Sequence, residues 1–305
     1  MKYRKLGNTG LEVSVLGFGG SSLGSVFAEI DEAEGVRTVH VAVDNGINLI
    51  DTAPYYGRTT GETILGRALR EIPREKYLLA TKVGRYGVAD FDFSAARVSR
   101  SVEESLRRLG VEHLDFVQAH DIEFGDLNQI VEETLPALRR LQAAGKVRFV
   151  GVTCLPLKLF QQVLARAEVD QIQSYCHYCL NDTALEDYLP DLQARGVAVF
   201  NSAPLGMRLL TREGPAAWHP APPALKAKGA EAAQFCHDRG ADLGRLALQF
   251  AVANAAIPTH IVGTASPGRM LQNIREIEAP LDEELLSGVR KILAPVHNLT
   301  WPSGR

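Results

Sequence analysis

The chain has 305 residues and a net charge of −3, and 46% of its residues are hydrophobic against 23% charged. This composition is typical of a globular protein with a large core, and the lack of a basic surplus argues against a nucleic-acid partner. No stretch approaches the roughly 18 apolar residues that a membrane span requires, and the N-terminus lacks the apolar core of a signal peptide. We expect a cytoplasmic location, reduced cysteines and a single domain over residues 1–305.

Short apolar runs alternate with amphipathic stretches along the chain. Residues 3–13 predict a β-hairpin that turns at Asn8–Gly10, and the run VSVLGFG at 13–19 predicts the first strand of a sheet. Seven further runs rich in Val, Ile, Leu or Phe predict buried parallel strands at 47–51, 76–82, 114–120, 146–153, 169–174, 197–202 and 257–264.

Helical patterns lie between these runs. Apolar residues recur every three or four positions in residues 31–44, 95–109 and 128–144. Helices that alternate with buried strands indicate βαβ units, and eight strands predict an α/β fold, a (β/α)8 TIM barrel with the N-terminal β-hairpin across its floor. The Pro-rich segment 214–226 is expected to form a long loop after the seventh strand.

The main alternative is a doubly wound nucleotide-binding sheet. That fold requires the motif G-x-G-x-x-G between a strand and a helix. The nearest match, GFGGSS at 17–22, has Ser22 in place of the third glycine, and no helical pattern follows it directly. We therefore prefer the barrel.

Polar residues end many of the predicted strands. These residues are Asp51, Lys82, His120, Thr153, Ser202 and, less neatly, Gln171. The carboxyl ends of barrel strands converge on one mouth, where the active sites of barrel enzymes lie. Any one of these residues, taken alone, would be interpreted as the solvent-exposed end of a strand. An Asp, a Lys and a His that end three successive strands, with Tyr56 close behind Asp51, instead predict a shared pocket.

These four residue types suit the transfer of a hydride to or from a carbon that bears oxygen. The oxygen needs a proton donor or acceptor, and a free tyrosine with a pKa near 10 is a poor base at neutral pH. We expect the Lys82 ammonium to lower the pKa of Tyr56, and Asp51 to orient Lys82. His120, as a neutral imidazole, is expected to hold the reacting oxygen.

Six segments resemble, in order, the signature segments of the aldo-keto reductase superfamily. They are DTAPYYG (51–57), ATKVG (80–84), VQAHD (117–121), GVT (151–153), NSAPLG (201–206) and TASPGRMLQN (264–273). The resemblance implies a barrel that binds NAD(P) without a Rossmann domain, with Asp51, Tyr56, Lys82 and His120 as its catalytic tetrad. It also implies that the cofactor is bound by Thr153, Gln171, Ser202, Pro204, Leu205, Gly263, Thr264, Arg269 and Asn273.

Three positions depart from the commonest pattern of that superfamily. Cys154 replaces an asparagine, Ser202 replaces an aromatic ring, and Gly263 replaces a lysine of NADP-preferring members. Ser266 and Pro267 predict a helix start, which places Arg269 and Asn273 on one face near a helix N-terminus. The missing lysine favours NAD as cofactor, with NADP as the alternative because Arg269 can bind a 2′-phosphate.

A closer likeness concerns SYCHYCLND (174–182) and GPAAWHPAPPALK (214–226). Both are similar to segments of the L-galactose dehydrogenase branch, whose members oxidise an aldose at C1 to a lactone. The likeness implies an L-galactose-like sugar substrate. His177, Tyr178 and Trp218 are candidate substrate residues: Trp218 would cover substrate or cofactor or else anchor its loop, and His177 would reach the substrate or else be a hydrogen-bonded structural histidine. The neighbouring Ser174, Tyr175 and Asn181 would add polar groups to the pocket wall.

Two other functions stay open at this point. One is an NADPH-dependent aldehyde or ketone reductase of broad specificity, and the other is a non-enzymatic relative that keeps the barrel. Cys176 and Cys179 form a C-x-x-C, but no second pair completes a zinc site, so we expect no metal. We expect a small-molecule sugar or carbonyl substrate, no membrane partner, and a monomer or small homo-oligomer.

Overall fold

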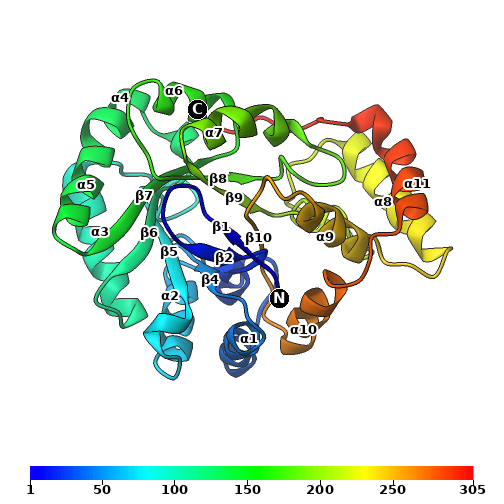
Figure 1. The fold of residues 1–305 in the computed structure, drawn as a ribbon, viewed down its shortest axis with the longest axis horizontal. Coiled ribbons are helices and arrows are strands. Elements are labelled where there is room, and N and C mark those ends of the chain that lie inside the picture. Colours follow the sequence, from blue (N-terminus) through cyan, green and yellow to red (C-terminus); the bar gives the residue numbers. More distant parts are fainter. Residues whose placement is uncertain (305) are drawn as a thin grey trace.

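The computed structural model describes residues 1–304 and shows a closed barrel of eight parallel strands (Figure 1). The strands follow chain order around the barrel, and the last pairs with the first. They are β3 (Leu16–Gly19), β4 (Leu49–Asp51), β5 (Leu78–Val83), β6 (Leu114–Ala119), β7 (Val147–Cys154), β8 (Gln171–Tyr175), β9 (Ala198–Ser202) and β10 (Thr259–Val262). All eight strands lie within or beside the predicted apolar runs, so the barrel prediction is confirmed.

Helices surround the barrel on its outer side (Figure 1). They are α1 (Glu32–Asp44), α2 (Thr60–Leu69), α3 (Ala95–Leu109), α4 (Leu127–Gln129), α5 (Leu135–Ala143), α6 (Lys158–Leu164), α7 (Leu189–Ala194), α8 (Pro223–His237), α9 (Leu243–Ala253), α10 (Pro267–Glu276) and α11 (Glu283–Leu293). The predicted helix 95–109 matches α3 at both ends. Its Ser94 caps the start through a bond from the Arg97 amide, and Gly110 ends it with a left-handed backbone.

The predicted helix 128–144 is interrupted. Residues Ile130–Thr134 form a π-helical turn between α4 and α5. Pro136, the second residue of α5, has no N–H to give to the carbonyl of Glu132. A wider turn is one way for a helix to accommodate such a gap, and helical periodicity alone did not reveal it.

The predicted hairpin is confirmed by β1 (Tyr3–Lys5) and β2 (Glu12–Ser14), which pair antiparallel. Its Leu6 and Val13 are fully buried among apolar residues inside the barrel, including Phe116 and Phe200. These side chains fill the end of the barrel near the strand N-termini. The interior is therefore apolar at that end, which leaves the polar interior residues near the strand C-termini.

Helices α2 and α3 approach each other closely at Gly66. A Cβ atom at Gly66 would lie 2.1 Å from the backbone oxygen of Arg108. The Arg108 side chain crosses the same contact and donates to the buried Glu62 carboxylate at 2.7 Å. The absence of a side chain at Gly66 thus sets the distance between two helices that support β5.

Substitution of Gly66 by alanine is expected to lower stability by about 1–3 kcal/mol, because the new methyl must displace backbone rather than a flexible side chain. Gly268, in the first turn of α10, has open space around its would-be Cβ and serves as the control. Gly268→Ala should leave the free energy of unfolding unchanged or slightly raised. Urea denaturation of both variants measures the difference, and equal midpoints would contradict the close approach.

Candidate active site

Four predicted residues meet at the C-terminal ends of the strands. Asp51 is the last residue of β4, Lys82 lies near the end of β5, His120 follows β6, and Tyr56 lies in the turn between β4 and α2. The Tyr56 and His120 rings stand edge to face, with centroids 5.9 Å apart. Lys82 Nζ lies 5.2 Å from the centroid of the Tyr56 ring. The structure thus brings the four side chains into one cluster.

Lys82 and Asp51 form a buried ion pair at the centre of this cluster. Lys82 Nζ donates to Asp51 Oδ1 at 2.8 Å, to Asp51 Oδ2 at 2.7 Å and to the backbone oxygen of Thr52 at 2.8 Å. Both side chains are almost fully buried. The three N–H donors of the ammonium therefore all have acceptors, and none is left for the Tyr56 hydroxyl.

The pKa of Tyr56 differs from the sequence-based expectation. Burial, followed by the carboxylates of Asp51 and Asp121, raises the pKa of Tyr56 well above 10. The Arg85 cation opposes this rise in pKa. The expectation of a lowered Tyr56 pKa is therefore wrong for this structure, because burial and the two carboxylates dominate. Tyr56 is therefore a phenol at neutral pH.

His120 is a neutral imidazole, as predicted. Burial, and then the positive charges of Lys82 and Arg85, lower the pKa of His120 well below 6.5. Its Nδ1 atom is buried without a protein partner. A neutral ring can both donate and accept a hydrogen bond, which suits a residue that holds a reacting oxygen.

A second charged pair beside the cluster was missed by the sequence analysis. Arg85 forms an ion pair with the buried Asp121, whose Oδ2 lies 3.7 Å from His120 Nε2. The Arg85 guanidinium also stacks on the Tyr55 ring at 3.9 Å. Asp121 has a left-handed backbone with φ of 51°, a strained conformation that often marks functional sites. The only sequence signal was an acidic residue directly after His120.

Gln173, which the sequence did not indicate either, is hydrogen-bonded to the last residues of β4 and β9. Its amide nitrogen donates to Asp51 Oδ2 at 3.2 Å and to Ser202 Oγ at 2.7 Å. The predicted Gln171 lies at the start of β8, opposite Gly151 of β7. Both polar atoms of the Gln171 amide are buried without a partner, so this side chain can accept and donate to a bound amide group.

The residues assigned to the cofactor by resemblance surround the same mouth. Thr153 and Ser202 lie near the ends of β7 and β9, Pro204 and Leu205 follow β9, and Gly263 and Thr264 follow β10. A Cβ at Gly263 would lie 2.9 Å from the Gly19 oxygen, so the close approach of β10 and β3 leaves little space for a larger residue.

The start of α10 fits an anionic ligand. Ser266 caps this helix by accepting from the Arg269 amide, as predicted. Arg269 is exposed and bonds only Gln272 at 3.2 Å, which leaves most of its guanidinium free. Arg269 and Asn273 lie one turn apart near the start of α10, as predicted, with Arg269 exposed and Asn273 buried. The orphan amide of Gln171 and this helix start are both compatible with a nicotinamide dinucleotide.

The proposed substrate residues separate into different environments. His177 is buried and its Nδ1 lies 3.1 Å from Asp182 Oδ2, close to the end of β8. Tyr178 stacks on Phe250 of α9 at 5.3 Å, so its expected place in the pocket wall is wrong. The backbone of Cys176 is left-handed with φ of 62°, and it redirects the chain just before these residues.

Trp218 lies at the mouth. Its exposed ring contacts Phe27, at a centroid distance of 5.8 Å, and thereby joins the loop after β9 to the loop after β3. His219 beside it is contacted edge to face by Trp301 of the C-terminal segment. The same segment reaches the β6 loop, where Ser303 donates to the buried Glu123 at 2.9 Å. Burial and the neighbouring Asp121 raise the pKa of Glu123 to about 7.

The buried surroundings of the four cysteines suit a structural role. All four are buried free thiols, and burial raises the pKa of Cys179 above its usual range. Within residues 1–304, no group of three or more His, Cys, Asp or Glu side chains is arranged to hold a metal ion. No helix in that range is long and apolar enough to cross a membrane.

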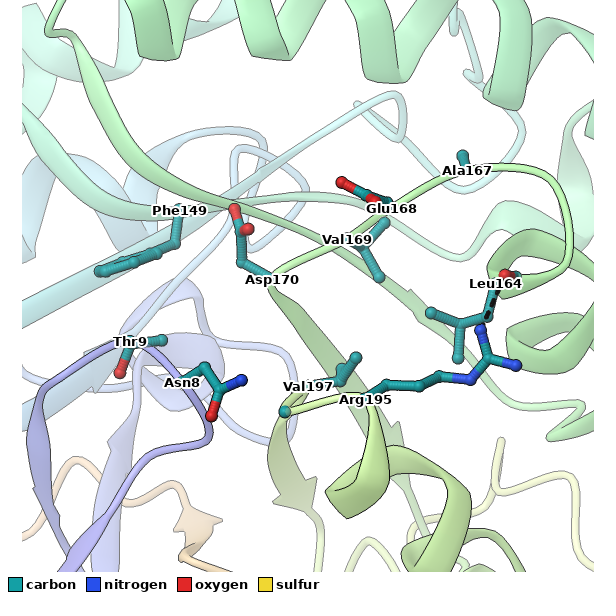
Figure 2. A pocket seen from close by; sticks show the side chains of 11 residues that line it. Asn8, Thr9, Phe149, Leu164, Ala167, Glu168, Val169, Asp170, Arg195 and Val197 are labelled. Carbon is teal, nitrogen blue, oxygen red and sulfur yellow. Dashed lines mark hydrogen bonds between the residues drawn. The ribbon is translucent and has the colours of Figure 1, made fainter.

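A cavity of about 410 Å³ lies at the other end of the barrel (Figure 2). It opens between the hairpin turn at Asn8 and the segments that lead into β8 and β9. Two of its charged groups have partners: Asp170 accepts from Arg139 at 2.6 Å, and Arg195 donates to the Leu164 oxygen at 3.2 Å. The cavity is remote from the strand C-termini, so we place the functional site at the mouth.

Known proteins resemble this chain over most of its length. The family model described as "Aldo/keto reductase family" matches residues 15–294. An L-galactose dehydrogenase from Arabidopsis thaliana is 49% identical over 100% of this chain and 98% of its own. A D-arabinose 1-dehydrogenase from Saccharomyces cerevisiae is 33% identical over 79% of this chain and 76% of its own.

A solved structure, an aldo-keto reductase from Bacillus halodurans in its holo form, superposes with a TM-score of 0.80 at 28% identity. The alignment covers 100% of this chain and 99% of that one. The family match extends from the first barrel strand to the last helix and includes every residue of the tetrad. The chain therefore belongs to the aldo/keto reductase family and is an oxidoreductase.

Proposed function

We propose that this oxidoreductase oxidises an aldose at its anomeric carbon, with transfer of a hydride to NAD and release of a lactone. The observation that carries the proposal is the 49% identity, over the full length, to a protein named L-galactose dehydrogenase. Two further relatives are named D-arabinose 1-dehydrogenase and D-threo-aldose 1-dehydrogenase, at 33% and 28% identity. An L-galactose-like sugar is the proposed substrate.

The buried cluster supports this chemistry. Tyr56, once ionised, is the base that takes the proton of the anomeric hydroxyl. The neutral His120 holds that hydroxyl in line, and the buried Asp51–Lys82 pair lies beside the tyrosine ring. The nicotinamide ring, when bound, supplies the hydride acceptor. The residues that would hold the cofactor are Thr153, Gln171, Ser202, Pro204, Leu205, Gly263, Thr264, Arg269 and Asn273.

The rim of the mouth suits a polyhydroxylated ring. Asp121, Glu123 and Tyr175 supply hydrogen-bonding groups next to His120, and His177 is held by Asp182 nearby in the chain. Carboxylates of this kind accept hydrogen bonds from sugar hydroxyls, whereas a simple aldehyde has no hydrogen-bond donor for them. The exposed Trp218 is proposed to cover the bound ligands from the β9 loop.

One observation favours a second function, the reduction of aldehydes or ketones with NADPH. Because the pKa of Tyr56 lies well above 10, the residue is protonated at neutral pH and is a ready general acid. A spectrophotometric panel of free aldoses with NAD and of aldehydes with NADPH separates the two functions. Ready reduction of carbonyls, without oxidation of any aldose at alkaline pH, would replace our proposal.

Tyr56→Phe is expected to cut turnover by at least about a hundredfold, the usual contribution of a general acid–base group. Cofactor affinity and the thermal unfolding midpoint should stay near wild type, because only one hydroxyl is removed. The adjacent Tyr55 carries the Arg85 stack and not the proton transfer, so Tyr55→Phe is the matched control. Turnover near wild type in Tyr56→Phe would remove this residue from the mechanism.

The oxidation rate is expected to rise with pH throughout the alkaline range, because the base form of Tyr56 is required and its pKa is raised. Arg85→Met removes the cation that opposes the increase in the pKa of Tyr56, and it leaves Asp121 without its ion-pair partner. The pKa of Tyr56 then increases further, and the activity curve moves to higher pH. Arg97 stacks on Tyr86 at 3.8 Å, and Arg97→Met is the control. An unchanged curve in Arg85→Met would contradict the assignment.

NAD is expected to bind with a lower Kd than NADP, because Gly263 offers no cation for a 2′-phosphate and has little space for a larger residue. Isothermal titration calorimetry with each cofactor measures this preference. Arg269→Ala should change the Kd for NAD only slightly. If NADP bound more tightly and lost that advantage in Arg269→Ala, Arg269 would be a phosphate ligand and the preference for NAD would be wrong.

A further inference from the structure

The C-terminal segment, residues 297–304, crosses the mouth of the barrel and contacts two of the loops around it. Figure 1 shows the chain leaving α11 and running toward α6 and α7. Trp301 contacts His219 of the β9 loop edge to face, with centroids 5.2 Å apart. Further along, Ser303 Oγ donates to Glu123 Oε1 of the β6 loop at 2.9 Å. The segment is therefore attached to two different sides of the mouth.

The Glu123 carboxyl under this segment is buried, but only one of its oxygens is used. Its residue exposes 8% of its surface. Besides Ser303, Oε1 accepts from the Leu155 amide at 3.1 Å and from the Tyr175 hydroxyl at 3.4 Å. Oε2 is buried and has no partner within residues 1–304. A buried carboxyl oxygen without a partner is costly, so this site is incomplete without a further hydrogen-bonding group.

The carboxyl lies close to the group that is proposed to hold the reacting oxygen. Asp121, two residues earlier in the same loop, has its Oδ2 at 3.7 Å from His120 Nε2. Tyr175, which donates to Glu123, is the last residue of β8. A sugar ring carries hydroxyls on neighbouring carbons. A ring whose anomeric oxygen contacts His120 therefore has further hydroxyls to offer to Glu123.

Ser303 presents to Glu123 the same chemical group that a sugar would present, an aliphatic hydroxyl. Gly304 beside it has a left-handed backbone with φ of 107°, and a Cβ there would lie 2.8 Å from the backbone oxygen of Glu123. A larger residue at this position would be strained and would collide with the β6 loop. The glycine thus lets the chain approach closely enough to place the hydroxyl on the carboxyl.

We propose that Glu123 is a specificity-determining residue that accepts a hydroxyl of the sugar ring, and that the Ser303 hydroxyl occupies this acceptor until the sugar displaces it. The inference rests on the proposed function, because it assumes a polyhydroxylated substrate. A sugar regains at Glu123 the hydrogen bond that is lost when Ser303 leaves. A simple aldehyde has no hydroxyl to replace it, so the C-terminal segment selects against such substrates.

The charge of Glu123 gives the site a pH dependence. Burial, followed by the charge of Asp121, raises the pKa of Glu123 to about 7, so the carboxylate predominates at alkaline pH. An ionised acceptor binds a hydroxyl more strongly than a neutral one, so sugar affinity should rise as the pH increases through about 7. The groups that face Glu123 are Asp121, which is paired with Arg85, Cys154 of β7 and Tyr175 of β8, both neutral because their pKa values are raised, and the uncharged Ser303 hydroxyl.

The test measures binding rather than turnover, with 1,5-anhydro-L-galactitol as the probe. This compound keeps the other ring hydroxyls of L-galactose but has no anomeric hydroxyl, so it cannot be oxidised to a lactone. Calorimetry at saturating NAD gives its Kd for the wild type, Glu123→Gln, Ser303→Ala and Ser303→Thr. Glutamine keeps an oxygen that can accept from Leu155 and Tyr175, and thermal unfolding verifies that each variant is folded.

Glu123→Gln should raise the Kd about tenfold or more at alkaline pH, because a hydrogen bond to a charged group is lost. It should also abolish the increase in affinity through neutral pH. Ser303→Ala should lower the Kd about two- to tenfold, because the competing hydroxyl is removed, while Ser303→Thr should match the wild type. Glu168→Gln removes an exposed carboxyl at the other end of the barrel and is the control.

Two results would overturn the inference. One is an unchanged Kd in Glu123→Gln. The other is a Kd in Ser303→Ala that is unchanged or higher, which would make Ser303 a fastener of the C-terminal segment and not a competitor of the sugar.

Assays of the wild type separate this inference from the proposed function. If no aldose is oxidised and the anhydroalditol does not bind, the proposed function and the inference fail together. If aldoses are oxidised while Glu123→Gln and Ser303→Ala keep the wild-type Kd, only the inference fails.

Discussion

The active-site end of this barrel depends on the buried ion pair between Lys82 and Asp51. Removal of an ammonium and a carboxylate from water costs several kcal/mol for each ion, and this cost is offset only by close geometry and further hydrogen bonds. The structure supplies both: two short contacts between the ions, the Thr52 carbonyl and the Gln173 amide. Every donor of Lys82 is used in this way, and burial together with the Asp51 and Asp121 carboxylates keeps the pKa of Tyr56 high.

The barrel interior is divided into an apolar end and a polar end, and this division makes the buried ion pair feasible. Leu6 and Val13 of the hairpin, together with Phe116 and Phe200, fill the end near the strand N-termini. The apolar filling contributes the stability of a well-packed core and excludes water from that side. Polar side chains are thereby confined to the interior layers near the strand C-termini, where the strand ends hold them at fixed spacing. The cavity next to the hairpin turn lies at the opposite end of the barrel from these polar groups.

Much of this organisation follows from local sequence patterns, and the remainder depends on contacts distant in the chain. Asp51, Lys82 and His120 end apolar runs, so their convergence could be predicted from the barrel alone. The link from Gln173 to Asp51 could not, because it crosses the barrel interior. The ion pair of Arg85 depends on the left-handed backbone of Asp121. The outward position of Tyr178 follows a similar left-handed turn at Cys176. A left-handed backbone has no sequence signature when the residue is not a glycine.

The aromatic contacts at the mouth have an optical consequence. The chain has two tryptophans, and both lie against His219: Trp218 in a stacked arrangement and Trp301 edge to face. His219 accepts from the Ala221 amide at Nδ1, so Nε2 carries the hydrogen and faces the Gly206 oxygen. The tryptophan emission of the protein, excited selectively above the tyrosine absorption, therefore originates at the rim of the candidate active site. Any movement of the β9 loop or the C-terminal segment changes that emission without an attached dye.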